Sequence, residues 1–463
     1  MQKDKDVTKT SDIRKLIARR LKLWNDQRFE ELISEAEMCN KKLPQNQMKI
    51  TDEKALVIFS RLIFSGKIRE ATRFITERQE SGGIMMPDED AVKPAGKTVL
   101  EVLQMKHPDE SEPHIDAFVS CEELPILLEV TITEAHIRKT AHKLSGSAGP
   151  SGADSTLWQA MLLKYGNHSK ELREAMAVLT ERQANKIVEW VEVRAQKAKR
   201  EIALRKLPAG VRPIGVGELC DRCADKTMLE VTGDDVKNVC NTDQLCSGIK
   251  SGMEGAIHAI RQLYQEKCDD GFGLLLMDID ASNAFQTISR AAALWNARVL
   301  WSRCARFLFN SYRGYALLII KGTSATLLSK EGVTQGVPLS MKLYAIGLLP
   351  LVQKLRDSSD YVKQELSERA SEYMLELDTS KDICESPHWI QNWYADDSSN
   401  IFYLRLIFIW LKLLLKEPPK FGYVAETDKS YLVVEPKFVE EAKKMFSKFQ
   451  MNVVSGQKLL GGL

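Results

Sequence analysis

No stretch of this sequence is apolar for long enough to cross a bilayer, and no stretch looks like a secretory signal. The most apolar segment, Ile401 to Leu415, is interrupted by Arg405 and Lys412 and is too short for a transmembrane helix. The N-terminal residues, Met1 to Asp6, are mostly charged and polar. We therefore expect an intracellular protein, cytoplasmic or nuclear, that has no membrane partner.

The chain also lacks an excess of charge of either sign. Its 65 Lys and Arg residues face 63 Asp and Glu residues, which gives a net charge of +2. A global positive field is therefore absent, and any contact with nucleic acid must come from local basic patches. The 44% hydrophobic and 28% charged residues are typical of a globular protein, and 463 residues predict more than one domain.

The cysteines do not form the regular pattern of a disulfide framework. There are nine, an odd number, and they are widely spaced, as expected for free thiols in a reducing compartment. Cys220 and Cys223, with Cys240 and Cys246, also permit a reading as zinc ligands. The later pair has the wrong spacing for zinc and no His accompanies it, so we favour free thiols.

The periodicity of apolar residues predicts three regions. Helical spacing in Ile13–Leu21 and Leu56–Ile63 predicts a helical N-terminal region over residues 1–85. Residues 86–140 are expected to form a connector with short elements, a helix at Thr98–Met105 and a strand at Ile126–Ile132. Residues 141–463 combine both periodicities, so the predicted fold class is α+β.

Within the third region, residues 155–203 read as helical, and a basic run extends from Arg194 to Lys206. Most runs of this kind are solvated helix faces. The final residues, Gln457 to Leu463, resemble a strand that stops. We therefore expect the chain to be truncated.

Residues Gln391 to Asn400 form the most informative stretch. The adjacent carboxylates of Asp396 and Asp397 stand between two β-prone runs, which predicts a β-hairpin with both acids at its tip. Like charges this close repel each other, and a cation between them relieves the repulsion. The pair alone is equally consistent with a solvated turn.

Two earlier motifs add to this pair. Residues Gly273 to Phe285 read as a buried strand that runs into a polar turn carrying Asp278 and Asp280. An acid at the end of an apolar strand is costly unless it is paired, hydrogen-bonded or bound to a metal, although it can also cap a helix. Glu331 to Ser340 contains two glycines and a proline, which predicts a loop that approaches a ligand closely or simply a loop before a helix.

In this order the three motifs resemble the palm of reverse transcriptases. They read Asp280-x-x-x-Ala-Phe285, Gln335-Gly336-x-Pro-Leu-Ser340 and Tyr394-Ala-Asp-Asp397. Leu207–Gly215 resembles the fingers motif of that family, Lys429 its lysine after the hairpin, and Leu459–Gly462 the start of its primer grip. The resemblance covers about residues 140–463, and the whole chain is similar to reverse transcriptases of retrotransposons.

The resemblance implies a right-hand palm and fingers with a mostly helical N-terminal region, and a thumb that is missing or truncated. It also implies an RNA-directed DNA polymerase that adds dNTPs to the 3′-hydroxyl of a primer on an RNA or DNA template. Asp280, Asp396 and Asp397 would be catalytic and would hold two Mg²⁺ ions, or Mn²⁺ in their place, about 3.5–4 Å apart. Asp278 would be structural.

The resemblance assigns further residues to the substrate. Lys206 or Arg205, with Arg212, would bind the β- and γ-phosphates, and Lys429 would act as a general acid toward pyrophosphate. Phe285 would exclude a 2′-hydroxyl, and Gln335 and Gly336 would contact the incoming nucleotide. Gln286 and Val337 depart from the usual motifs without removing a metal ligand.

Two other functions are compatible with the sequence. One is a catalytically retired, polymerase-like remnant that binds nucleic acid or a protein partner. The other is a template-independent or RNA-making nucleotidyltransferase, which Phe285 disfavours because its ring would exclude the 2′-hydroxyl.

Overall fold

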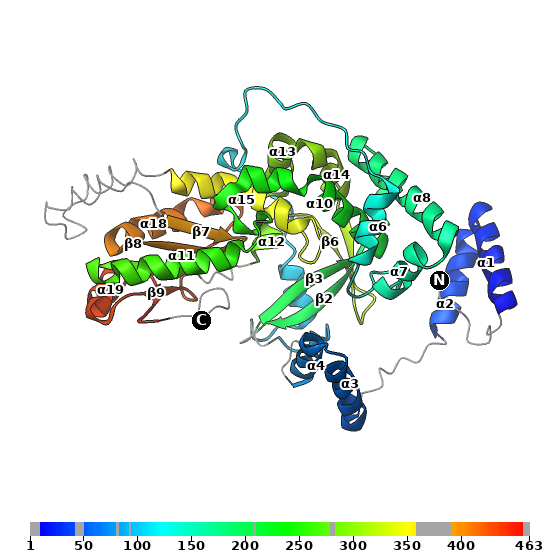
Figure 1. Cartoon of the computed structure of the whole chain (residues 1–463), viewed down its shortest axis with the longest axis horizontal. Coiled ribbons are helices and arrows are strands. Elements are labelled where there is room, and N and C mark those ends of the chain that lie inside the picture. The colour runs from blue at the N-terminus through cyan, green and yellow to red at the C-terminus, as the bar shows by residue number, and fades with distance from the viewer. Residues whose placement is uncertain are drawn as a thin grey trace. The chain divides into compact units, whose positions relative to one another are not determined.

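The chain combines helices with β-sheets, as the α+β prediction requires, and it divides into two compact units, residues 1–83 and 84–463 (Figure 1). The computed structural model describes residues 10–41, 51–79, 83–91, 94–206, 210–277, 283–357 and 390–456. Among these residues, no helix is both long and apolar enough to span a membrane.

The first unit consists of helices that pack in pairs. α1 (Thr10–Asn25) packs against α2 (Phe29–Lys41), and α3 (Asp52–Phe64) packs against α4 (Ile68–Gln79). All four lie within the region predicted to be helical. The Arg20 guanidinium donates a hydrogen bond of 2.7 Å to Glu35, which joins the first pair.

The first sheet of the second unit is built around strand β2 (Lys199–Lys206). It pairs antiparallel with β3 (Gly210–Gly217) on one side and parallel with β5 (Ala316–Ile320) on the other. β1 (Ile84–Met85) and β6 (Thr326–Ser329) complete this sheet.

The prediction that residues 155–203 are helical was therefore wrong beyond residue 193. Helices end at Asn185 and Val193, and the basic run continues as strand β2. The side chains of Lys199, Glu201 and Ala203 are buried, whereas Arg205 is exposed. Pairing with β3 and β5 outweighs the local helical pattern because it satisfies the strand's backbone groups on both edges.

The second sheet has the strand order β10–β9–β4–β8–β7 and contains the predicted hairpin. β4 (Phe272–Met277) is buried along its whole length between β8 and β9. β7 (Ile390–Tyr394) and β8 (Asp397–Tyr403) form the hairpin, which confirms that prediction. β9 (Tyr431–Val433) and β10 (Asn452–Val454) are parallel to each other.

Helices cover these sheets and form one large hydrophobic core with them. Trp393 of β7 packs against Trp410 of α18 (Leu404–Lys416), with ring centroids 6.4 Å apart. Gln391 links three elements: its amide donates to the Val352 carbonyl of α15 (Ser340–Arg356) at 2.9 Å and accepts from the Trp410 indole at 3.0 Å. The hairpin is thus fixed to two helices.

The remaining helices complete the unit. The α-helices are α5 (Val99–Met105), α6 (Glu134–His142), α7 (Ser155–Leu163), α8 (Gly166–Asn185), α9 (Trp190–Val193), α10 (Leu219–Cys240), α11 (Gly252–Lys267), α12 (Ala284–Thr287), α13 (Arg290–Leu300), α14 (Ser302–Tyr312) and α19 (Val439–Met445). The 3₁₀ helices are η1 (Ile115–Ala117), η2 (Asn241–Asp243), η3 (Leu245–Ser247), η4 (Cys268–Asp270), η6 (Pro418–Phe421) and η7 (Pro436–Phe438).

The predicted strand at Ile126–Ile132 is absent; this segment is extended but pairs with no strand. Side chains of α8 satisfy part of its backbone instead. Val130 exchanges two hydrogen bonds of 2.8 Å with the Asn185 amide, and the Ile132 N–H donates to Glu181 at 2.7 Å. The β-branched run therefore stays extended without joining a sheet.

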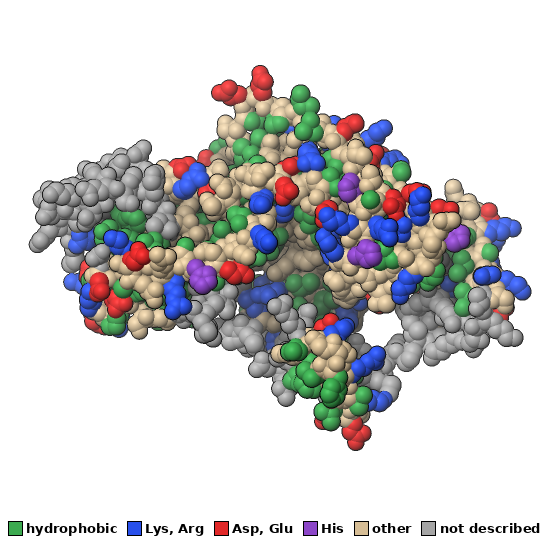
Figure 2. All heavy atoms as spheres, viewed as in Figure 1, with side chains coloured by type: hydrophobic (Ala, Val, Ile, Leu, Met, Phe, Trp, Pro, Cys, Tyr) green, Lys and Arg blue, Asp and Glu red, His purple; other side chains and the backbone are tan. Residues whose placement is uncertain are grey.

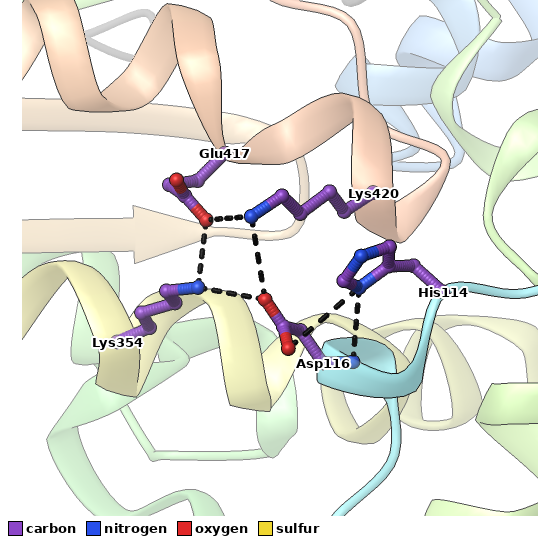
Figure 3. Close-up of polar contacts among 5 residues, drawn as sticks. All are labelled: His114, Asp116, Lys354, Glu417 and Lys420. Carbon is purple, nitrogen blue, oxygen red and sulfur yellow. Dashed lines mark hydrogen bonds and ion pairs between the residues drawn. The ribbon is translucent and has the colours of Figure 1, made fainter.

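A polar network ties the 3₁₀ helix η1 to the end of α15 and to η6 (Figure 3). Lys354 of α15 lies 2.8 Å from Asp116 and 2.6 Å from Glu417. Lys420 lies 2.8 Å from Glu417 and 3.4 Å from Asp116, and the His114 ring accepts the Asp116 N–H at 3.1 Å. These contacts hold the connector region against the core.

The cysteines of the described part are free thiols, as predicted. Cys220 and Cys223 both lie on α10, and burial raises the pKa of their thiols to about 11 and about 12. These thiols stay protonated at neutral pH and contribute to the packing of that helix.

Candidate active site

The tip of the β7–β8 hairpin is held in an uncommon backbone conformation by a side chain from η2–η3. Tyr394 pairs with Asp397, so Ala395 and Asp396 form the turn, and Ala395 has a left-handed φ of 55°. The fully buried Gln244 amide accepts from the Ala395 N–H at 3.0 Å and donates to its carbonyl at 2.9 Å. These two bonds offset the cost of the left-handed turn.

A second side chain fixes the next residue of the tip. The Tyr423 hydroxyl donates a hydrogen bond of 2.9 Å to the backbone carbonyl of Asp396. Because the backbone on both sides is fixed, the Asp396 carboxylate has a defined position.

Asp396 is half-buried, and its environment favours the neutral acid. Burial raises the pKa of its carboxyl group to about 6, and the nearby charges of Lys206 and Arg212 partly oppose this shift. A carboxylate that is costly to ionise without a partner becomes a good ligand when a cation binds, because the cation removes that cost.

Two cationic side chains, Lys206 and Arg212, lie near this acid, and two more, Lys429 and Lys106, lie near Lys206. Lys206 ends β2, Arg212 lies on β3, Lys429 precedes β9, and Lys106 directly follows α5. The pKa of Lys206 is lowered to about 8, first by burial and then by the charges of Arg212, Lys429 and Lys106, whereas the charge of Asp396 opposes this shift. The pKa of Lys106 is also lowered, first by burial and then by the charge of Lys429.

These cations repel one another more than the acids near them compensate. Glu426 forms an ion pair with Lys429 and raises the pKa of Lys106, but all four cations lie within reach of one another. Figure 2 shows Lys and Arg side chains at the bottom of a hollow near its centre. A site of this kind favours a ligand that carries several negative charges.

Phe285 stacks on a tyrosine that lies near the acidic tip. Its ring stacks on Tyr344 of α15, with centroids 4.6 Å apart and an interplanar angle of 20°. Burial raises the pKa of Tyr344 well above its usual value, and the charges of Asp396 and Asp397 add to this shift. The stack therefore lies within the electrostatic field of the Asp pair.

The Gln335-Gly336 loop lies between β3 and Phe285. The Gly215 N–H of β3 donates to the Gln335 carbonyl at 2.9 Å, and the Val333 N–H donates to the Phe285 carbonyl at 2.7 Å. Gly336 has a φ of 107°, and a Cβ there would lie 2.9 Å from the Gly215 carbonyl oxygen. Glycine is therefore required for this close approach.

Arg290 of α13 anchors the same loop from inside the protein. Its buried guanidinium donates to the carbonyls of Ser329, Glu331 and Gly332 at 2.7–2.9 Å. The Glu331 carboxylate accepts from the Arg290 N–H at 2.7 Å. The loop position is thus set by a fully hydrogen-bonded buried cation.

The structure brings most of the predicted site residues into one region. Lys206, Arg212, Asp396 and Lys429 interact electrostatically, and backbone contacts join Phe285, Gln335 and Gly336 to one another and to β3. Asp278 and Asp280 lie outside the described residues, as do the Leu207–Ala209 part of the fingers motif and Leu459–Gly462. β4 ends at Met277, which pairs with Ser398, so the described chain leaves this strand beside the hairpin tip.

Sequence reasoning missed Lys106, Gln244, Tyr344 and Tyr423. Lys106 follows a predicted helix, but no motif singles it out, and Gln244 lies in a stretch without periodicity. The roles of Lys106 and Gln244 depend on contacts across more than 100 residues of sequence, such as the bonds between Gln244 and Ala395. No local pattern in the sequence could have found them.

No protein-family model matches this chain, and no curated protein matches it. The site is therefore interpreted from its own chemistry. Within the described ranges, no group of three or more His, Cys, Asp or Glu side chains could hold a metal ion. The adjacent carboxylates of Asp396 and Asp397 are hard oxygen donors of the kind that Mg²⁺ prefers, and the half-buried Asp396 gains most from such a cation.

Proposed function

We propose that this chain is an RNA-directed DNA polymerase with a right-hand palm and fingers, as its resemblance to retrotransposon reverse transcriptases implies. The observation that carries the proposal is the half-buried Asp396 at a hydrogen-bonded hairpin tip, near the charges of Lys206 and Arg212, with the charges of Lys106 and Lys429 acting on Lys206 in turn. A carboxylate able to hold a cation, next to an excess of cations able to hold an anion, fits the transfer of a nucleotide from its triphosphate.

In the proposed reaction, the 3′-oxygen of the primer attacks the α-phosphorus of a dNTP. The bond from the α-phosphorus to the oxygen that bridges it to the β-phosphate breaks, and pyrophosphate leaves. Such a transfer depends on positioning and on the stabilisation of negative charge. Lys206 and Arg212 would bind the β- and γ-phosphates, and Lys106 and Lys429 would add positive charge.

Asp396 and Asp397, with Asp280, would hold two Mg²⁺ ions. When bound, these ions supply positive charge to the attacking and leaving oxygens. The protein's contribution is the fixed position of the acids, which Gln244 and Tyr423 provide.

The other residues would position the nucleotide and transfer a proton. The Phe285 ring, supported from behind by Tyr344, would exclude a 2′-hydroxyl and so select dNTPs over NTPs. Lys429 is the proposed general acid toward pyrophosphate. Lys206, whose pKa is about 8, is a second proton donor with a pKa near neutral pH.

The test is primer extension by the full chain on an annealed RNA template, with dNTPs and Mg²⁺ or Mn²⁺. We expect extension by the wild type and a loss of at least about 1,000-fold in Asp396→Asn, because the amide cannot replace a metal-binding carboxylate. Asp109→Asn is the matched control, since Asp109 is an exposed acid whose side chain pairs with Lys330 at 2.5 Å. It should leave the rate unchanged.

Other outcomes would contradict the proposal in distinct ways. Equal extension by Asp396→Asn would exclude the hairpin tip as the catalytic site. Incorporation of NTPs instead of dNTPs would indicate an RNA-making enzyme. Binding of template and primer by the folded chain without extension would indicate a retired polymerase.

A further inference from the structure

A second cavity of the larger unit contains arginine side chains whose donors have no acceptor. The cavity has a volume of about 850 Å³ and lies between α13 and α14, under the connector residues 110–112 and the extended segment at Leu127. This extended segment is the cyan trace at the top of Figure 1. A volume of this size is typical of sites for small molecules.

Three arginines contribute to the lining of this cavity. Arg298 lies on α13, Arg306 lies on α14, and Arg313 directly follows α14, so that Arg306, Phe309 and Arg313 share one face. Nη1 of Arg298, Nη1 of Arg306, and Nε and Nη2 of Arg313 are buried without a hydrogen-bond partner among the described residues. A buried donor without an acceptor is costly, because it loses its hydrogen bond to water on folding.

The acidic side chains of the lining do not neutralise these arginines. Five cationic and three acidic residues line the cavity. Glu331 accepts from the backbone N–H groups of Arg290 at 2.7 Å and Ser111 at 2.9 Å, and Glu110 accepts from Tyr315. Two of the three carboxylates, those of Glu331 and Glu110, thus have other donors, and cationic side chains outnumber acidic ones in the lining.

Much of the remaining lining is apolar. Phe118, Leu127, Leu294 and Phe309 contribute hydrophobic surface, and Phe309 also lies 5.4 Å from the Arg313 guanidinium. An inorganic phosphate would leave most of this surface and volume unused.

We infer that this cavity binds a small amphipathic anion, with one carboxylate, sulfonate or phosphate group on an aromatic or aliphatic body. The acidic group accepts hydrogen bonds from Arg298, Arg306 and Arg313, and the body lies against the apolar lining. This site is distinct from the hairpin tip and does not depend on the proposed polymerase function.

The test compares two fluorescent probes that share an apolar body. 8-Anilinonaphthalene-1-sulfonate carries the acidic group, and N-phenyl-1-naphthylamine lacks it. We expect saturable binding of the sulfonate to the wild-type full chain, weakened at least about tenfold in Arg298→Gln and Arg306→Gln, since a charged hydrogen bond contributes about 1.5–3 kcal/mol. The amine should bind all these proteins alike.

Arg303→Gln is the matched control. Arg303 lies on the same helix but is bonded to Asp235 at 3.0 Å and to the Val231 carbonyl at 2.9 Å, outside the cavity. It should leave the affinity for the sulfonate unchanged. Circular dichroism checks that each variant is folded.

Three results would overturn the inference: no saturable sulfonate binding by the folded wild type, no effect of Arg298→Gln and Arg306→Gln, or an equal loss in Arg303→Gln. Displacement of the bound sulfonate by phenyl phosphate would indicate an aromatic ligand, and displacement by decanoate an aliphatic one. Displacement by neither compound would also count against the inference.

Discussion

Two clusters of charged residues lie at opposite ends of strand β2 and differ in how their charges are balanced. Near its start, Lys197 and Lys199 meet Asp221 and Asp225 of α10, and all four are buried. At its end, Lys206 joins the cations around Asp396. The first cluster contains two cations and two acids, whereas cations predominate in the second.

The balanced cluster is closed by its own hydrogen bonds. Lys197 Nζ lies 2.5 Å from Asp221 Oδ1, Gln196 donates to the same oxygen at 3.3 Å, and Lys199 donates to the Lys197 carbonyl at 3.2 Å. Burial raises the pKa of Asp225 to about 8 and lowers that of Lys199 to about 8. Such a cluster stabilises the joint between β2 and α10 and needs no ligand.

The comparison distinguishes charges that stabilise the fold from charges that are available to bind a ligand. Buried charges that serve the fold are paired within the protein, because an unpaired buried charge is costly. Several guanidinium nitrogens of the cavity arginines have no hydrogen-bond partner within the described residues, and three cations act on Lys206 against the one acid, Asp396. An incomplete balance of charge is thus the physical mark shared by the two proposed sites.

The largest effect on stability is expected from breaking the balanced cluster. Asp221→Asn leaves Lys197 buried without its counter-charge and should lower the free energy of unfolding by about 3–5 kcal/mol. Asp396→Asn should leave the free energy of unfolding unchanged or raise it, because it removes a carboxylate whose ionisation burial disfavours. Chemical denaturation at pH 7.5 measures both. Equal destabilisation by the two variants would contradict the distinction.

A smaller effect is expected at the support of the hairpin tip. Gln244→Leu removes both hydrogen bonds to Ala395 and leaves buried backbone groups unpaired, which should lower the free energy of unfolding by about 1–3 kcal/mol. The rate of primer extension should fall as well, because Asp396 loses its fixed position. Gln262→Leu is the control, since Gln262 is an exposed residue of α11 bonded to Glu266. A loss of stability without a loss of rate would show that the tip needs no such support.

The smallest effect is expected from removing one of the cations. Lys106→Gln should raise the KM for dNTPs about 3–10-fold with little change in kcat, since a single charge near a phosphate contributes about 1 kcal/mol. Lys106→Arg should retain the affinity, and Lys443→Gln, at an exposed lysine paired with Glu440, should have no effect. A change in kcat alone would contradict a role in binding the triphosphate.

The Lys106→Gln variant also tests the pH dependence of dNTP affinity and of activity. Lys206 is charged below its pKa of about 8, so the affinity for dNTPs should fall as the pH rises through 8. Asp396 is ionised above its pKa of about 6, so activity should rise as the pH increases through 6. Removing the Lys106 charge relieves its repulsion of Lys206, which should raise the pKa of Lys206 and move the loss of dNTP affinity to higher pH.

The sequence by itself determined the local elements of the site. An alternating apolar pattern with two acids in a turn specified the hairpin at 390–403, and an unbroken apolar run specified the buried strand β4. Thr98 and Glu101 specified helix α5 through a capping box. These features depend on residues a few positions apart, so periodicity and turn chemistry suffice to predict them.

Only the tertiary structure decided which segments meet. β2 is a strand because β3 and β5 satisfy its backbone, although its sequence reads as the end of a helix, and residues 126–132 stay outside any sheet because α8 supplies their hydrogen bonds. The roles of Lys106 and Gln244 depend on partners that are distant in sequence. Those of the three cavity arginines depend on guanidinium nitrogens that have no hydrogen-bond partner among the described residues. Burial and charge balance are properties of the assembled core, and a local pattern contains no information about them.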